Sequence, residues 1–290
     1  MDIATTTPPL CGPEFGSYAA DEVTWLLKDL SDVALRQRVL RPMLRDGLLT
    51  AEGELWKRTR KSLAPVFTPR NIHALAPIME ERSRLFAEGL ARDSGTRTDI
   101  AFQMTLLTYD ILQSTLFSND IAGEPTEFAE AMELFLKRMG RVDPLDILDA
   151  PAFIPRIGRL LGQRSTKYFR GVIAGTMERR ARLLDEAPEE APNDFLTMLL
   201  KADGLSRSEI EDNIITFIGA GHETTARALG WTLYLLSQAP HEREKVEAEL
   251  DTVLSTLPDP ATWLDALPHT RAAFEEAMRL YPPAPSLNRT

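Results

Sequence analysis

The stretch that most constrains the fold of this chain is residues 206–238, SRSEIEDNIITFIGAGHETTARALGWTLYLLSQ. Its start carries a capping box, in which the Ser206 hydroxyl accepts from the N–H of Glu209 and the Glu209 carboxylate reaches back. Apolar residues then recur at helical spacing until Pro240, which ends the helix. At ~1.5 Å per residue the helix is roughly 45–50 Å long, enough to cross a domain. Few polar residues follow the first turns, so we expect most of its faces to be buried.

The centre of this predicted helix, residues 219–225, departs from what a core helix usually contains. It holds two glycines, each of which lowers helix stability by about 1 kcal/mol relative to alanine. The Thr224 hydroxyl can bond back to the carbonyl of Ala220, which loosens the helix locally. The glycines predict room for a flat group, and the loosened helix predicts a local groove. Thr224 and the adjacent Glu223 form a carboxyl–hydroxyl pair that could pass protons. Close packing of another helix against the small residues is the alternative interpretation.

Composition limits the class of protein. The 290 residues are 43% hydrophobic and 26% charged, which is typical of a globular protein. The net charge of −10 argues against nucleic acid as a partner. No apolar run approaches the ~18 residues of a membrane span, and the N-terminus does not resemble a secretory signal. The single cysteine, Cys11, excludes internal disulfides and leads us to expect a cytoplasmic protein.

Hydrophobic periodicity predicts a mainly α chain, because almost no region alternates at period two. We expect a loose tail over residues 1–20 and one helical domain over residues 21–290. The Pro-rich segment 143–158 is either a lid over a pocket or an irregular connection, and residues 255–266 form a turn-rich connection. Besides the central helix, we expect a helix that starts near Glu52. The other expected helices are 21–45, 71–95, 99–118, 127–140, 159–185, 194–201, 240–254 and 268–280.

The predicted helix 159–185 has many basic residues, which we interpret as a solvated face. These residues are Arg164, Lys167, Arg170, Arg179, Arg180 and Arg182.

A second motif lies in the predicted helix that starts near Glu52. Trp56 and Arg60 are four residues apart and therefore share a face. One interpretation is an ordinary amphipathic helix with a cation–π pair. The other is that the indole N–H and the guanidinium both donate to a buried anion, such as a carboxylate of a bound cofactor.

Five motifs follow one another along the chain: Gly53-x-x-Trp56-x-x-x-Arg60, Pro65-x-Phe67, Ala220-Gly221-x-Glu223-Thr224-Thr225, Glu276-x-x-Arg279 and Leu280-Tyr281-Pro282-Pro283. Taken in this order, they resemble the cytochrome P450 superfamily of haem-thiolate monooxygenases, over about residue 45 to the last residue. The resemblance implies a mainly α, P450-like fold with the long central helix crossing the haem site.

The resemblance also implies a role for residues around the cofactor, haem b. Ala220 and Gly221 would allow close approach to the porphyrin, and Glu223 and Thr224 would deliver protons to dioxygen. Trp56, Arg60 and Arg289 would hold the haem propionates. Glu276 and Arg279 would form a buried structural ion pair that is costly to break.

Substrate and electron transfer follow from the same resemblance. Leu48, Leu49 and Phe217, with the loop 150–158 and its Phe153 and Ile154, would line a pocket for a hydrophobic small molecule. Electrons would come from NAD(P)H through a ferredoxin or flavin-type partner. That partner would be steered by outward cations, namely Lys57, Arg58 and Lys61.

One departure from the family pattern concerns the iron ligand. The family uses a cysteine in a Phe-x-x-Gly-x-x-x-Cys loop beyond the Glu-x-x-Arg helix, and no such loop occurs here. Cys11 lacks that context, so we do not expect it to be the ligand. We therefore expect a fragment, a split gene or a decayed copy that is inactive alone. The alternative is a non-catalytic α-helical protein that binds a ligand or a subunit on a decayed P450 framework.

Overall fold

The structure is a computed structural model, and it describes residues 40–42, 44–92, 95, 97–121, 134, 145 and 157–284. Several of the features expected from the sequence lie wholly or largely outside these residues. They are the tail with Cys11, the helices at 21–45 and 127–140, the segment 143–158 with Phe153 and Ile154, and Arg289.

The described residues are helical, with no strand among them, which confirms the mainly α prediction. Most predicted helices are found within a few residues of their expected bounds. The 255–266 connection is more ordered than expected, because it contains two short helical turns. The elements are α3 (Gly53–Leu63), η2 (Ala64–Phe67), α4 (Pro69–Arg92), α5 (Ile100–Phe117), α8 (Ile157–Glu186), α9 (Phe195–Leu200), α10 (Arg207–Gln238), α11 (Pro240–Thr256), η3 (Pro260–Thr262), α12 (Trp263–Ala266) and α13 (Pro268–Leu280).

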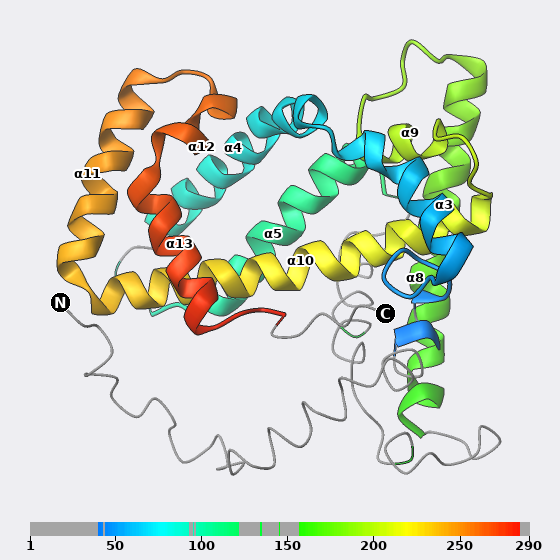
Figure 1. Cartoon of the computed structure of the whole chain (residues 1–290), viewed down its shortest axis with the longest axis horizontal. Helices are drawn as coiled ribbons and strands as arrows, with labels where there is room; N and C mark the ends of the chain where they lie inside the picture. Colours follow the sequence, from blue (N-terminus) through cyan, green and yellow to red (C-terminus); the bar gives the residue numbers. More distant parts are fainter. Residues whose placement is uncertain are drawn as a thin grey trace.

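Helix α10 is the central element, and the others are arranged along it (Figure 1). Its N-terminus has the predicted capping box: Ser206 Oγ accepts from the N–H of Glu209 at 3.3 Å, and the Glu209 carboxylate accepts from the N–H of Ser206 at 2.7 Å. Helices α11, α12 and α13 gather at its C-terminal end, and α3, α8 and α9 at its N-terminal end. Helix α5 packs along its length.

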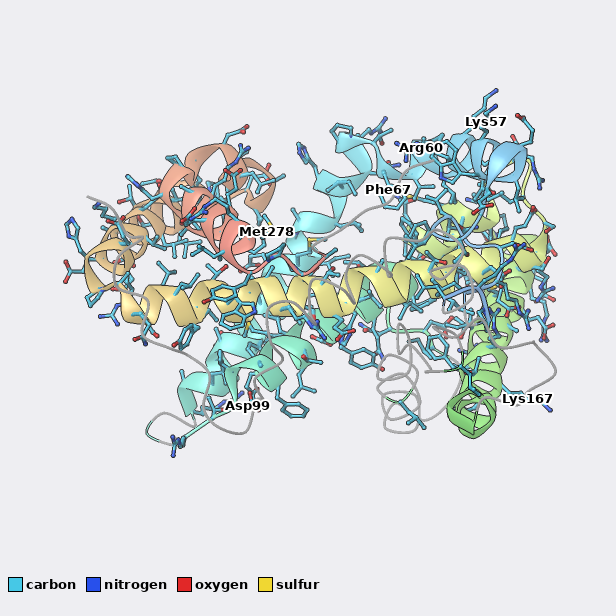
Figure 2. The ribbon with its side chains drawn as sticks, turned by 60° about the horizontal axis from the view of Figure 1, so that its bottom comes forward. Lys57, Arg60, Phe67, Asp99, Lys167 and Met278 are labelled. Carbon is cyan, nitrogen blue, oxygen red and sulfur yellow. The ribbon has the colours of Figure 1, made fainter. Side chains whose placement is uncertain are left out.

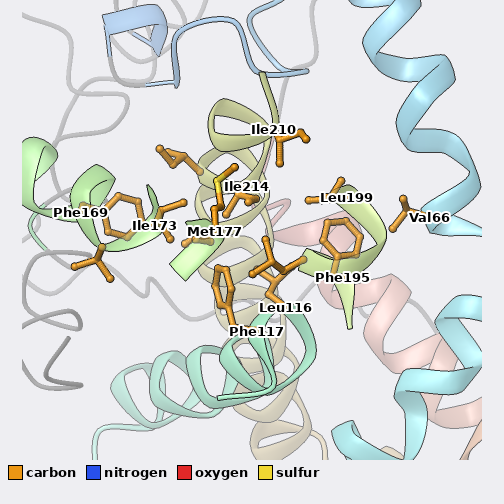
Figure 3. Close-up of a cluster of buried hydrophobic side chains, with 14 of the residues drawn as sticks. Val66, Leu116, Phe117, Phe169, Ile173, Met177, Phe195, Leu199, Ile210 and Ile214 are labelled. Atoms are coloured by element: carbon orange, nitrogen blue, oxygen red, sulfur yellow. The ribbon is translucent and has the colours of Figure 1, made fainter. Parts of the chain in front are cut away.

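The main hydrophobic core surrounds the N-terminal half of α10 (Figure 3). Ile214, Ile215 and Ile218 are fully buried there, against α5, α8 and α9. Phe117 and Phe169 are the largest fully buried apolar side chains of this cluster. This packing fixes the position of α10 relative to three helices. None of the helices in the part of the chain that the structure describes is long and apolar enough to cross a membrane.

The prediction of a solvated basic face on α8 is wrong for two residues. Arg180 is 0% exposed and donates to the carboxylate of Asp194 at 2.6 Å, to the Thr197 hydroxyl at 2.8 Å and to the carbonyl oxygen of Phe117 at 3.2 Å. Arg170 is also buried and forms ion pairs with acidic residues of α10. The partners of both arginines come from distant segments, and charge patterning along one helix does not reveal them.

Candidate functional site

One face of α10 is covered at both ends and open in the middle. Asn213, Ala220, Thr224 and Trp231 share this face, because their spacings of seven, four and seven residues are close to whole helical turns. At one end Asn213 accepts a hydrogen bond from the N–H of Leu48 at 2.9 Å. At the other end, Trp231 stacks on Tyr281, the residue that follows α13. Between them, over an interval of roughly 27 Å, Ala220 is exposed and Thr224 half-buried.

The stacking partner of Trp231 is Tyr281, which directly follows α13. The two rings are parallel within 8°, with centroids 3.9 Å apart. Gly221, beside Ala220, is exposed as well, and a Cβ atom added to it would meet only Leu112 Cδ1 at 3.6 Å. We call Ala220, Gly221 and Thr224 the open face. The small residues there leave this part of α10 exposed.

The predicted proton-relay residues are both engaged within α10. Thr224 Oγ1 donates to the carbonyl oxygen of Ala220 at 2.6 Å, which confirms the predicted back-bond. Glu223 forms an ion pair with Arg227, one turn further on. More than a third of the Glu223 side chain is exposed, so its carboxylate is in contact with solvent. The acid and the hydroxyl are nonetheless neighbours at the middle of α10.

The opposite side of α10 is closed by α5. His222 is buried there, and its Nε2 bonds to the carbonyl oxygen of Thr105 at 3.1 Å. The ring of Tyr109 meets the imidazole edge-on at 6.1 Å. Burial lowers the pKa of His222 and outweighs the opposing effects of the Thr105 carbonyl and of Glu223. His222 is therefore a neutral packing residue and not part of the open face.

Helix α3 carries the predicted cofactor-carboxylate donors. The Arg60 guanidinium lies 5.6 Å from the ring centroid of Trp56, so the cation–π pair of the simpler interpretation is present. Trp56 is 39% exposed and Arg60 is exposed. Neither the indole N–H nor the guanidinium bonds to any residue that the structure describes. Figure 2 shows Arg60 and Phe67 on the same side of α10 as Met278 of α13.

The three cations expected to face a redox partner differ in their surroundings. Arg58 does not point away from the protein: it forms an ion pair with Glu209 and donates to the carbonyl oxygen of Gly204 at 2.9 Å. It therefore ties α3 to the start of α10. Lys57 pairs with Glu54 on the surface at 2.7 Å. Lys57 and Lys61 remain exposed.

The predicted substrate-pocket residues are not equivalent. Leu48 is half-buried and packs against the main core, whereas its neighbour Leu49 is 38% exposed. Phe217 meets the rings of Phe67 and Phe195 edge-on, at 5.4 and 5.1 Å. Phe217 therefore joins α10 to η2 and α9. Of the three, Leu49 has the side chain that is most available to a ligand.

The predicted structural ion pair on α13 forms, but it is not buried. Arg279 donates twice to the Glu276 carboxylate, at 2.7 Å each. The two side chains are 66% and 43% exposed. The hydrogen bonds and the charge of Arg279 lower the pKa of Glu276 despite its opposing desolvation. At this exposure the pair contributes little to the stability of the described part of the chain.

Two contacts that frame the open face were missed from the sequence. The first is the stack of Trp231 on Tyr281, whose partners are distant in sequence. The second is the bond between Asn213 and Leu48, which lies in a buried part of α10. A buried position for Asp212 and Asn213 was implied by the apolar neighbours on either side. Polar residues in such a position require partners, and that signal would have found this contact.

A haem is a flat, largely apolar ring with two carboxylates, so its fit can be tested against these residues. The open face offers a surface without large side chains, and Arg60 and Trp56 offer free donors to a carboxylate. Arg60 lies on the same side of α10 as Met278 of α13 (Figure 2), and Trp231 of α10 stacks on Tyr281, which follows α13. The described residues thus fit one face and one carboxylate of a haem. They include no cysteine, since Cys11 lies outside them.

The chain is similar in sequence to known proteins. Cytochrome P450 4F3 of Rattus norvegicus is 29% identical over 275 residues, covering 87% of this chain and 52% of its own length. Cyclooctatin synthase of Streptomyces melanosporofaciens is 28% identical over 262 residues, covering 86% of this chain and 54% of its own. The chain thus spans about half the length of these curated relatives.

The fold is shared with a solved structure as well. A crystal structure of a cytochrome P450 (CYP102L1) has a TM-score of 0.71 at 23% identity, covering 87% of this chain and 56% of that one. A sequence profile of the family Cytochrome P450 matches residues 26–290. The chain therefore belongs to the cytochrome P450 family.

Proposed function

We propose that this chain forms the distal side of a haem-dependent monooxygenase, which inserts one oxygen atom of O₂ into a hydrophobic small molecule. The observation that carries the proposal is the open face of α10, flanked by covered ends and accompanied by the free donors of Arg60 and Trp56. Family membership supports haem as the cofactor. The single cysteine fits a reducing compartment, and we place the protein in the cytoplasm.

Each residue of the site has a proposed part in binding. Ala220 and Gly221 would lie against the ring, and Trp56 and Arg60 would donate to one propionate. Arg289, outside the described residues, would donate to a propionate too. The chemistry that a bound haem supplies is the reduction of dioxygen, with one oxygen atom transferred to the substrate. Leu48, Leu49 and Phe217 would border the hydrophobic substrate.

Proton delivery is assigned to two side chains of α10. Because Thr224 Oγ1 donates its proton to the Ala220 carbonyl, its lone pairs are free to accept from a water molecule on the open face. More than a third of the Glu223 side chain is exposed to solvent, and its carboxylate is held in place by Arg227. Together they would pass protons from solvent to the reacting oxygen. Glu276 and Arg279 are proposed to have a structural role only.

The electron donor is proposed to be a ferredoxin or a flavin-type protein that takes electrons from NAD(P)H. Lys57 and Lys61 on α3 are exposed cations that can steer an acidic partner. Arg58 is excluded from this role because its guanidinium holds Glu209 and Gly204.

We also propose that residues 1–290 alone have little or no monooxygenase activity. Their single cysteine, Cys11, is not preceded by the Phe-x-x-Gly pattern of the family's thiolate loop. The same observation favours the second candidate, a non-catalytic protein that binds a ligand or a subunit on this framework. The two candidates differ in whether haem binds at the open face.

Haem titration separates these candidates. Haem b is added to the purified chain with imidazole, which serves as an external iron ligand, and the absorbance change is followed. The proposal predicts saturable one-to-one binding that Arg60→Gln weakens about tenfold, the loss of one charged hydrogen bond. Lys61→Gln, one position away, is the matched control and leaves binding unchanged. No saturable binding, or equal effects of both variants, would favour the non-catalytic candidate.

A further inference from the structure

The first half of α10 carries a stripe of polar side chains that is unusual for a buried helix. Glu209, Asp212, Asn213 and Thr216 are spaced three, one and three residues apart, and they therefore lie on one face. Asp212, Asn213 and Thr216 are each at most 4% exposed. Buried polar groups are costly unless they have partners. Asp212 is paired with Arg170 of α8 at 2.7 Å, and further partners of this stripe lie in the segment 44–58.

Asn213 is the centre of the stripe. Its Oδ1 accepts from the N–H of Leu48 at 2.9 Å, and its Nδ2 donates to the carbonyl oxygen of Glu209 at 2.7 Å. The side chain is fully buried, and both ends of the amide are satisfied. Asp212, the preceding residue, accepts from the N–H of Asp46 at 3.3 Å. Two backbone N–H groups of the turn 44–51 are thus held by adjacent side chains of α10.

Close packing reinforces these hydrogen bonds. A Cβ atom added to Gly47 would lie 2.0 Å from Thr216 Oγ1 and 2.7 Å from the carbonyl oxygen of Asp212. Gly47 does not have a positive φ, so the requirement for glycine comes from the approach of the turn to α10. Thr50 closes the turn from within, because its hydroxyl donates to the carbonyl oxygen of Arg45 at 2.7 Å.

The turn and helix α3 carry the residues of the proposed site. Leu49 follows directly on the bonded Leu48, and α3 with Trp56 and Arg60 begins a few residues later. The far part of this segment is tied down too, through the ion pair of Arg58 with Glu209. The stripe therefore holds the segment 44–58 at both ends against α10.

We propose that Asn213 is a positioning residue that fixes the turn 46–50 on α10 and thereby sets which hydrophobic molecules the site accepts. This inference rests on the proposed function for its second half only. Asn213 acts through the Leu48 N–H and does not itself contact the substrate. Loss of its acceptor would free the turn, so that Leu49 no longer has a fixed position.

The first test measures amide hydrogen exchange in purified residues 1–290. Asn213→Leu removes the acceptor at similar size, and we expect exchange of the Leu48 amide to become at least tenfold faster. Asn213→Asp keeps an acceptor oxygen and should leave that amide slow. Thr108→Val, which removes a buried hydroxyl that bonds only within α5, is the matched control and should not change it. Unchanged exchange in Asn213→Leu would overturn the proposal.

A second variant covers the case in which Asn213→Leu does not fold. Gly47→Ala leaves every hydrogen-bonding group in place and pushes the turn away from Thr216 and Asp212. It should accelerate exchange of the Leu48 amide in the same way. An unchanged rate in a folded Gly47→Ala protein would overturn the proposal independently.

The second test measures ligand selectivity on the same chain. Octanoate and hexadecanoate compete with the fluorescent probe 11-(dansylamino)undecanoate, and the ratio of their apparent Kd values is compared between variants. Asn213→Leu should change this ratio at least threefold, whereas Asn213→Asp and Thr108→Val should keep it. If Asn213→Leu speeds exchange of the Leu48 amide but leaves the ratio of Kd values unchanged, Asn213 has a structural role only and the selectivity claim is overturned. If the unsubstituted chain does not bind the probe, the selectivity claim fails with the proposed substrate class, and the exchange result stands by itself.

Discussion

The hydroxyl of Thr224 donates to the carbonyl oxygen of Ala220, so the side chain expected to handle protons is held inside its own helix. Its neighbour Glu223 is held as well, by Arg227 one turn further on. The donor proton of Thr224 is used, and its acceptor lone pairs are free. The hydroxyl can therefore fix a water molecule on the open face without breaking its own bond. Removing it should affect proton delivery more than stability.

Thr224→Ala is expected to uncouple oxygen consumption from product formation in a haem-loaded chain that has been completed with the family's cysteine loop. The ratio of product to O₂ consumed should fall at least about tenfold, which is within the range for loss of one proton-transfer group. The measurement is O₂ uptake and product yield in parallel. Thr232→Ala is the matched control, since Thr232 makes the same back-bond to Ala228 at 2.7 Å. Equal coupling in both variants would contradict the relay.

The stack of Trp231 on Tyr281 should hold the end of α13 against α10. A double-mutant cycle with Trp231→Leu and Tyr281→Leu is expected to give a coupling of ~0.5–1.5 kcal/mol in the free energy of unfolding. Denaturant titration gives the four values. The control cycle pairs Trp231→Leu with Trp263→Leu, whose indole bonds instead to the carbonyl oxygen of Leu257. Additive effects of Trp231 and Tyr281 would show that the stack carries no energy.

The start of α13 is capped from another helix. The Glu249 carboxylate of α11 accepts from the N–H groups of His269 and Thr270, at 2.8 Å each, and from the Thr270 hydroxyl at 2.8 Å. Glu249→Gln should lower the free energy of unfolding by about 1 kcal/mol at pH 7. Glu247→Gln, which removes an exposed pair with Arg243, should have little effect.

The same cap predicts a dependence on pH. Desolvation raises the pKa of Glu249, but the hydrogen bonds from His269 and Thr270 outweigh it, and the pKa lies below its usual value. Since the folded state then binds fewer protons, the contribution is present above the unfolded pKa of ~4.3 and is lost as the pH falls through the folded value. The difference between Glu249→Gln and the unsubstituted chain should therefore shrink below about pH 4. A constant difference would contradict the cap.

Arg180 should be one of the most sensitive positions for stability. Arg180→Met leaves the buried carboxylate of Asp194 without its ion pair, and should lower the free energy of unfolding by about 3–5 kcal/mol. Lys167→Met, on the exposed side of the same helix, should change it by less than ~0.5 kcal/mol. Denaturant unfolding measures both. Similar small effects would mean that Arg180 is solvated after all.

The sequence was informative where a structural signal is local. The capping box at Ser206, the glycine-containing centre of α10 and the back-bond of Thr224 all depend on residues within one or two turns. These features locate α10 and the open face. The cation–π pair of Trp56 and Arg60 was also one of two interpretations of a local spacing.

Features that depend on distant partners were not predictable in the same way. The environment of Arg180 is set by Asp194 and Phe117, and nothing in α8 itself distinguishes Arg180 from exposed arginines. The cap of α13 is supplied by Glu249 of α11. Arg58 of α3 forms an ion pair with Glu209 of α10, a partner that only the tertiary packing brings close. Periodicity identifies helices and their faces, but the pairing of charges between helices requires the fold.

The central claim is that the open face of α10 receives the haem, and Gly221 tests it most directly. Haem b is titrated into the chain with imidazole as iron ligand, for Gly221→Leu and for Gly171→Leu. Both glycines are exposed within helices, and a Cβ atom at Gly171 would have no neighbour within 4 Å. We predict that Gly221→Leu weakens binding at least about tenfold because a side chain on the face blocks the ring, while Gly171→Leu binds as the unsubstituted chain does. Equal haem affinity in the two variants would contradict the account.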